Sequence, residues 1–144
     1  MIDLDSQHNL TDIINFTADY NKTSYNLFFN SSLEETIIKT DFEGLDLVPA
    51  SMQLADIETE IDSLEDKELI LKSKLDNHGV EYDFILLDIP PALGYITINA
   101  LSSSNSIIIP SEPSLLALNG FEQLLELYNA IKEQVNSRLS IEGI

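Results

Sequence analysis

The chain has 144 residues, 44% hydrophobic and 22% charged, which gives one soluble domain enough apolar residues for a core. Its 25 Asp and Glu against 7 Lys and Arg leave a formal net charge of -18. That charge repels phosphate backbones and anionic lipid, and so argues against direct binding to DNA or to a membrane. The absence of cysteine excludes disulfides, thiolate chemistry and cysteine zinc sites.

Short apolar runs alternate with amphipathic stretches along the chain, which is the pattern of an α/β domain. Up to residue 39 these patterns predict a strand over residues 2–5, a helix capped by Asn9, a polar loop over 17–30, and a helix from the capping box at Ser32 through Lys39. From there to residue 77 they predict a strand over 45–49, a helix capped by Ser51, and a charged helix over 65–77. The apolar face of the helix after Ser51 holds Leu54, Ile57, Ile61 and Leu64. In the second half they predict a strand over 84–88, a helix over 92–101, a strand over 106–110, a long helix that includes Phe121 to Val135, and a strand that begins at Ile141.

This order predicts a single domain, residues 1–144, built on a doubly wound and mostly parallel sheet that is incomplete at both ends. Ligands of such sheets bind at the carboxyl ends of the strands. Three of the predicted strands end there in groups suited to a ligand site, namely Asp5, Asp88 and Pro110.

Two aspartates flank one residue on the first predicted strand. Asp3 and Asp5 are expected to point the same way, and two carboxylates on one face can hold a hydrated magnesium ion or orient a water molecule. Asp88 ends an apolar strand, where a carboxylate is costly unless something pairs with it, and a metal-bound water is one such partner. The residues alone leave a second interpretation open, in which these acids form turns or cap the next helix.

No segment indicates secretion or a membrane span. Residues 1–5 hold neither a basic region nor an apolar run of signal length, and the longest apolar stretches, such as 84–87, are of strand length. We therefore expect a cytoplasmic protein. The cluster of Lys67, Lys72 and Lys74 is typical of a solvated helix face rather than of a DNA site.

Several segments, taken together, resemble the ParA/Soj partition ATPases of the MinD/ParA class. Residues 2–11, IDLDSQHNLT, are similar to that family's IDLDPQGNxT. Residues 82–94, YDFILLDIPPALG, are similar to its YDYIIIDCPPSLG, which contains the Walker B acid. Shorter matches in the family's order are LDLVPAS at 45–51, TINAL at 97–101, IP at 109–110 and ALNG at 117–120.

The resemblance implies a P-loop NTPase-like fold of the deviant Walker A class, binding of ATP and Mg²⁺, a homodimer that sandwiches ATP, and a centromere-binding ParB-like partner that stimulates hydrolysis during partition of plasmid or chromosome DNA. It implies that Asp5 positions the attacking water, and that Asp3 and Asp88 hold magnesium through its waters. The other residues that it assigns are Gln7, Asn9 and Thr11 in a first switch, Pro90, Pro91 and Gly94 in a second, and Pro110 beside the adenine.

The chain departs from the family in one decisive way, because it contains no G-x-x-x-x-G-K-[ST] loop and hence no P-loop lysine. The family's version, KGGVGKT, lies upstream of the matched segments, and such a loop cradles the phosphates. We therefore expect residues 1–144 to be a fragment without ATPase activity of its own. Ser6, His8 and Ser114 replace the family's Pro, Gly and Glu. His8 is expected to be a lone surface histidine without the backbone freedom of glycine.

Two alternatives remain for the function. A non-catalytic protein could pair with a full-length homologue through an exposed sheet edge and reduce its dimerisation. A phosphorelay receiver would use Asp88 as phosphoacceptor, but it needs a lysine at the end of a later strand, and residues 107–112 read IIIPSE. Phosphate chemistry without a nearby cation makes the receiver the weaker alternative.

Overall fold

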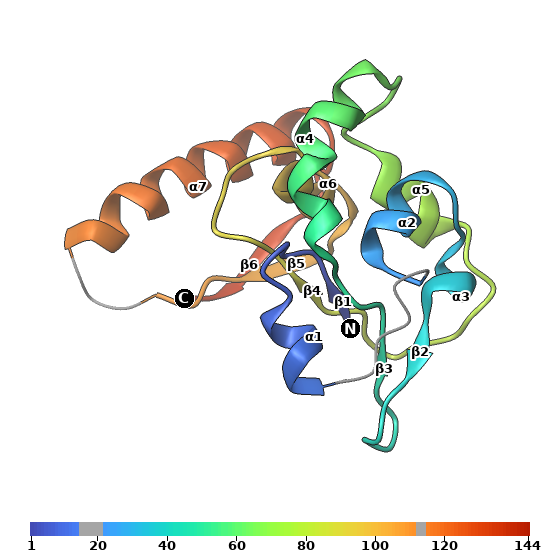
Figure 1. Cartoon of the computed structure of the whole chain (residues 1–144). Coiled ribbons are helices and arrows are strands. Elements are labelled where there is room, and N and C mark those ends of the chain that lie inside the picture. Colours follow the sequence, from blue (N-terminus) through green and yellow to red (C-terminus); the bar gives the residue numbers. More distant parts are fainter. Residues whose placement is uncertain (15–21, 112–114) are drawn as a thin grey trace.

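The computed structural model describes residues 1–14, 22–111 and 115–144 (Figure 1). Its elements follow in the order β1 (Ile2–Asp3), α1 (Asn9–Ile14), α2 (Ser24–Phe29), α3 (Leu33–Thr36), β2 (Ile38–Lys39), β3 (Asp46–Leu47), η1 (Met52–Asp56), α4 (Ile57–Glu60), η2 (Ile61–Ser63), α5 (Ile70–Asp76), β4 (Leu87–Asp88), α6 (Tyr95–Ser103), β5 (Ser106–Ile108), α7 (Leu115–Gln134) and β6 (Ser140–Gly143), where η marks a 3-10 helix. The predicted α/β fold with parallel strands is confirmed.

The strand β1 lies between two neighbours. It pairs in parallel with β4, so that Ile2 lies opposite Leu87 and Asp3 opposite Asp88. On its other side Ile2 forms a parallel bridge with Val48, and the Asp3 N–H donates to the Val48 carbonyl at 3.0 Å. The carboxyl ends of β1 and β4 therefore meet at one edge of the sheet, which is where the sequence places its aspartates.

The strands β5 and β6 form a second parallel pair. Within the described residues, no backbone hydrogen bond joins this pair to β4, so β4 and β5 each have one strand partner there. Parallel sheets are normally covered on both faces. Here Phe84 and Leu86, which precede β4, are 83% and 54% exposed, and Ile108 of β5 is 72% exposed. Apolar side chains next to β4 and within β5 are therefore exposed to solvent.

The strands β2 and β3 are antiparallel, with Ile38 opposite Leu47, and this hairpin was not predicted. The helix predicted through Lys39 is wrong at its end, because α3 stops at Thr36. Ile37 is extended, with φ -70° and ψ 133°. Two β-branched residues in succession favour an extended chain over a further helical turn, so residues 38–39 pair as a strand.

The loop predicted over 17–30 is wrong for the part that the structure describes. Residues 24–29 form α2, at whose start Asn26 Oδ1 accepts the N–H and the hydroxyl of Thr23 at 3.1 and 2.8 Å. Leu27 and Phe28 are buried in the core. The many polar residues of this segment hide a short amphipathic helix, because only two of its positions need to be apolar.

The helix predicted from Ser51 is a run of three short pieces, η1, α4 and η2. Leu54, Ile57 and Ile61 are fully buried, as the spacing predicts, whereas Leu64 is 40% exposed because η2 ends at Ser63. The apolar spacing therefore identifies the buried face even where the helix changes its pitch.

Other predicted bounds shift by a few residues. Asn9 is the first residue of α1 rather than its cap. The charged helix begins at Ile70 instead of 65, since Asp66 has φ +51°, a left-handed conformation that interrupts a helix. The remaining differences are that regular pairing covers 87–88 and 106–108 of the predicted strands, that β6 covers 140–143, that α6 covers 95–103, and that α7 covers 115–134.

Two apolar clusters form the core. The larger one lies where β1 meets α2, η1, α4, α5 and α6, and its fully buried members include Leu4, Leu27, Ile57 and Leu71. The smaller one joins α6 to α7 and β6 through Leu101, Tyr128, Ile131 and Leu139. In Figure 1, α7 reaches outward from this second cluster.

A buried side chain of α6 holds the beginning of α5. Asn99 is fully buried, and its Oδ1 accepts the Leu71 N–H at 3.0 Å. Its amide nitrogen donates to the carbonyls of Lys67 and Tyr95 at 2.7 and 2.9 Å. Because free N–H groups at a helix start need acceptors, Asn99 serves as a cap supplied from another helix.

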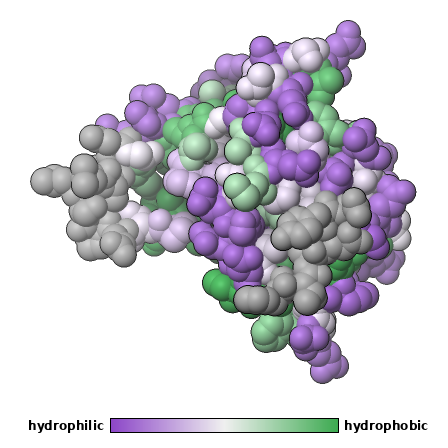
Figure 2. Space-filling view, viewed as in Figure 1, coloured by the Kyte–Doolittle hydropathy of each residue, from purple (hydrophilic) through white to green (hydrophobic). Residues whose placement is uncertain are grey.

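The surface agrees with the acidic composition. Hydrophilic side chains cover much of the face shown in Figure 2, interrupted by small apolar patches. None of the helices among the described residues combines the length and the apolar character that a membrane crossing requires.

Candidate functional site

The structure brings three aspartates together at the carboxyl ends of β1 and β4. Asp3 and Asp88 are opposite each other in the parallel register, and the Leu4 N–H donates to the Asp88 carbonyl at 2.8 Å. Asp5 follows two residues after Asp3, and its N–H donates to Asp3 Oδ1 at 3.1 Å. The expectation that acids at strand ends gather at one edge is met for these three residues.

The carboxylate of Asp3 is fully buried and strongly bonded. Its Oδ2 accepts both the backbone N–H and the hydroxyl of Thr11, at 2.9 and 2.7 Å. The Thr11 hydroxyl in turn accepts the Ala50 N–H at 2.9 Å. Asp3 thereby ties α1 and the segment after β3 to the carboxyl end of β1, and hydrogen bonds of this kind stabilise an ionised carboxylate inside a protein.

Asp5 opens the turn that leads into α1. Its Oδ1 accepts the Gln7 N–H at 2.9 Å, and its carbonyl accepts the His8 N–H at 2.9 Å. His8 has φ +47°, the left-handed region that favours glycine. The predicted need for backbone freedom at this position is confirmed. The half-buried imidazole pairs with Asp12, 3.2 Å from Nδ1 to Oδ2.

Asp88 is the exposed member of the three. Partial burial, followed by the nearby carboxylates of Asp3 and Asp5, raises the pKa of the Asp88 carboxyl above its usual range. The ionised form of Asp88 is therefore disfavoured at this edge. Among the described residues, no three His, Asp or Glu side chains converge closely enough to hold a metal ion directly.

The segment from Pro90 to Gly94 joins Asp88 to α6. Pro91 is exposed, and the Ala92 carbonyl accepts the Thr97 hydroxyl at 2.6 Å. Gly94 precedes the first residue of α6 and lies against the carboxylate of Glu58, a residue of α4 that sequence reasoning missed. Nothing in the local sequence links residues 36 positions apart, so only the folded chain reveals that contact.

Pro110 follows β5 and is exposed. It therefore lies beyond the end of β5, which pairs with β6 and not with the strands that carry the aspartates. Ser114 lies outside the described residues, so its replacement of the family's Glu has no structural account here.

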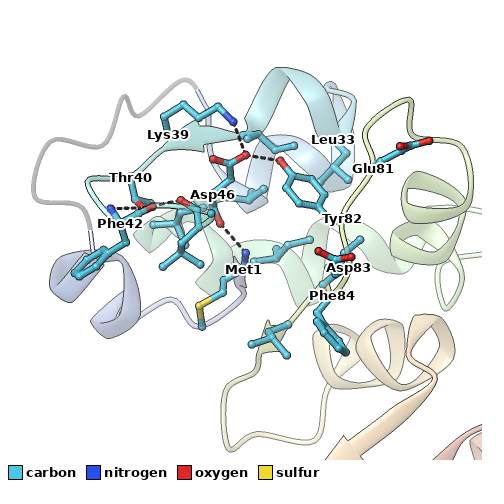
Figure 3. Close-up of a pocket in the computed structure, with 18 of the residues that line it drawn as sticks. Met1, Leu33, Lys39, Thr40, Phe42, Asp46, Glu81, Tyr82, Asp83 and Phe84 are labelled. Carbon is cyan, nitrogen blue, oxygen red and sulfur yellow. Dashed lines mark hydrogen bonds and ion pairs between the residues drawn. The ribbon is translucent and has the colours of Figure 1, made fainter.

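A cavity of about 640 Å³ lies at the opposite end of the strands, where β1 and β4 begin (Figure 3). Asp46 lies at its centre and accepts from Lys39 at 2.7 Å and from the Tyr82 hydroxyl at 2.6 Å, while its carbonyl accepts from the Met1 amine at 2.7 Å. Burial and this hydrogen bond raise the pKa of Tyr82 to about 12. The cavity does not include Asp3, Asp5 or Asp88.

The fold and the site together define a class of protein. It is an α/β domain whose carboxylates gather at the carboxyl ends of parallel strands. A family model described as an AAA domain matches residues 1–141. The chain therefore belongs to this family, in the group that contains the Soj and ParA partition proteins.

The chain is similar to relatives of known name and to solved structures. It is 37% identical to the sporulation initiation inhibitor protein Soj of Bacillus subtilis over 146 residues, which is 100% of this chain and 58% of Soj. A plasmid partition protein from Borrelia burgdorferi superposes with a TM-score of 0.85 at 27% identity, over 99% of this chain and 62% of that one.

Cobyrinic acid a,c-diamide synthase from Mycobacterium smegmatis, with a bound ATP analogue and magnesium, superposes with a TM-score of 0.87 at 28% identity, over 97% of this chain and 58% of that one. The chain thus spans a little over half the length of the proteins that it matches. Neither the receiver nor the non-catalytic partner is favoured by these comparisons.

Proposed function

We propose that residues 1–144 form the part of a partition ATPase that positions water and magnesium, acting in the segregation of plasmid or chromosome DNA. The observation that carries this proposal is the group of Asp3, Asp5 and Asp88 at one sheet edge. It is supported by the similarity to Soj and to a plasmid partition protein, and by a structural relative that binds an ATP analogue and magnesium.

Magnesium suits the charge at this edge. Three carboxylates lie close enough for two of them to raise the pKa of the third, and magnesium is a hard cation that keeps several waters and accepts oxygen ligands. The resemblance implies that Asp3 and Asp88 both hold waters of the ion. In our proposal the exposed Asp88 bonds to these waters, whereas Asp3, which is fully buried, contributes its charge and holds Asp5 and Thr11 in place. Bound magnesium would supply positive charge for the phosphates of a nucleotide.

Asp5 is the residue that we propose for positioning the attacking water. Its carboxylate is bonded to the Gln7 N–H through one oxygen, which leaves further acceptor capacity on both oxygens. The surrounding segments are proposed as the two switches, with Gln7, Asn9 and Thr11 in the first and Pro90, Pro91 and Gly94 in the second. Pro110 is proposed to lie beside the adenine.

The phosphates need donors that residues 1–144 do not contain. The sequence has no G-x-x-x-x-G-K-[ST] loop, and preorganised donors supply most of the stabilisation in phosphoryl transfer. We therefore propose that residues 1–144 alone bind ATP weakly and do not hydrolyse it. The active form would be a homodimer of ParA type, with a ParB-like partner, in which such a loop is present.

The proposal is tested by thermal melts in Mg-ATP of two proteins, residues 1–144 and the same chain preceded by a segment that carries the family's KGGVGKT loop. Ligand at about 100 times its Kd stabilises by about 2.7 kcal/mol, a shift of several degrees for a domain of this size. We expect no shift for the first protein and a shift for the second. The second protein with Asp5→Asn should retain the shift and lose hydrolysis. No shift in the extended protein would contradict the proposal.

A further inference from the structure

The carboxylate of Glu58 fills the space beside Gly94. Glu58 lies on α4, and its Oε2 accepts the Tyr95 N–H at 3.0 Å while Oε1 accepts the Ile96 N–H at 3.5 Å. These are the first two N–H groups of α6. A side chain at residue 94 would overlap the carboxylate, because a Cβ built there meets Glu58 atoms at less than contact distance.

The glycine at 94 is explained by this space and not by its backbone. Gly94 has φ -112° and ψ -164°, an extended conformation that any residue adopts. It offers no side chain to cap α6, and no cap of that kind is present. Helix starts leave unpaired N–H groups that prefer an anionic acceptor. Glu58 supplies that acceptor from a different helix.

A second contact joins the same two regions. The Tyr95 hydroxyl donates to Asp62 Oδ1 at 3.0 Å, and Lys67 pairs with Asp62 at 2.6 Å while lying 4.9 Å from the centre of the Tyr95 ring. The hydrogen bond to Asp62 raises the pKa of Lys67, so this lysine stays charged. Tyr95 is thus held at its backbone by Glu58 and at its side chain by Asp62.

We propose that Glu58 is a positioning residue for the loop that follows Asp88. The loop leaves β4 at Asp88 and rejoins the core at Gly94, and Glu58 fixes the second of these ends. The body of α6 beyond it is already fixed, since Ile96 and Asn99 are buried. The position of the loop that follows Asp88 therefore depends on a carboxylate in α4. We call the contact of the Glu58 carboxylate with the N–H groups of Tyr95 and Ile96 the clamp. The clamp does not depend on the proposed function, but its importance for magnesium or nucleotide does.

The clamp is tested by amide hydrogen exchange, followed by NMR on residues 1–144 without nucleotide. Glu58→Ala should speed exchange at Tyr95 and Ile96 roughly twofold to thirtyfold, the factor that corresponds to loss of a helix cap. Glu58→Gln keeps a neutral acceptor and should give an intermediate rate. Glu60→Ala is the matched control, because Glu60 lies on the same helix and accepts a hydrogen bond from Tyr25 instead.

A double-mutant cycle separates the clamp from general destabilisation. Gly94→Ala should displace the Glu58 carboxylate and reproduce the effect of Glu58→Ala, and the double variant should add little further, because both changes remove one interaction. Chemical shifts of residues 89–94 should move in both variants and stay unchanged in Glu60→Ala. Additive effects, or unchanged exchange at Tyr95 and Ile96 in both Glu58 variants, would overturn the proposal.

The exchange measurement stands apart from nucleotide binding. If exchange shows the clamp but the melting temperature of the extended chain does not change in Mg-ATP, the proposed function is contradicted. Glu58 then remains the positioning residue of the loop. If the extended chain binds Mg-ATP and the Glu58 variants do not alter exchange, the clamp fails and the proposed function remains.

Discussion

Asp3 and Asp88 lie opposite each other in the parallel register of β1 and β4, and the first carboxylate is fully buried whereas the second is exposed. The two carboxylates also differ in the hydrogen bonds that they accept. Asp3 accepts hydrogen bonds from Thr11 and Asp5. The pKa of the Asp88 carboxyl is raised by partial burial first and then by the carboxylates of Asp3 and Asp5.

Replacing Asp3 by Asn should destabilise the fold by about 2–3 kcal/mol, because a buried carboxylate that accepts three N–H or O–H groups becomes an amide that presents two donors to them. Urea denaturation measures the loss. Asp12→Asn is the control, since Asp12 is exposed and pairs only with His8 among the described residues. Equal stability of the two variants would contradict a structural role for Asp3.

Asp88→Asn should raise stability at neutral pH. The folded-state pKa of Asp88 is raised, so its ionised form is disfavoured in the folded state and the penalty is present above that pKa. The gain should fade as the pH falls through the folded pKa and vanish below the ordinary aspartate value. Denaturation curves of wild type and variant across acidic and neutral pH measure this. A gain that is independent of pH would show that charge is not its cause.

His8→Gly should stabilise the chain by about 0.5–1 kcal/mol, because a non-glycine residue at φ +47° is strained. The lost pair with Asp12 and the greater freedom of glycine in the unfolded chain offset part of the gain. Thermal melts provide the measurement. His78→Gly, at a residue without positive φ, should be destabilising or neutral, and the same gain at both sites would remove the backbone explanation.

Asn99→Ala should cost about 2–4 kcal/mol, since it leaves the Leu71 N–H and the Lys67 carbonyl without their buried partner. Amide exchange should quicken first at the beginning of α5. The exposed Asn77 bonds only to the Ser73 carbonyl among the described residues, and Asn77→Ala should change stability by less than about 0.5 kcal/mol. A small effect at Asn99 would mean that water replaces the amide.

Patterns of apolar residues predicted the α/β class and the clustering of the acids. The acids at the ends of the apolar runs were a weak signal by themselves, because such residues also form turns and caps; their order in the family's motifs made the prediction. The burial expected for the run before Asp88 is wrong, since Phe84 and Leu86 are exposed. Leu54, Ile57 and Ile61 were placed on a buried face from their spacing alone.

The misses arise where tertiary contacts decide the structure. The helix α2 was missed because its polar residues serve as caps, and β2 was missed because pairing with β3 competes with one more turn of α3. Glu58 could not be recognised, since its partners are Gly94, Tyr95 and Ile96 in a distant segment. The glycine at 94, just before a helix, is the sequence signal that points to a close approach.

The most direct test of a magnesium site at this edge is a pH titration of the aspartate side-chain carboxyl carbons by ¹³C NMR, with and without excess MgCl₂. We expect Asp88 to titrate above the ordinary aspartate range without magnesium and at lower pH with it. Asp46, at the opposite end of the strands, has a pKa lowered by its hydrogen bond from Lys39 and should titrate at the same pH in both. An Asp88 curve that magnesium leaves unchanged would contradict the site, and with it the role that we propose for the three aspartates.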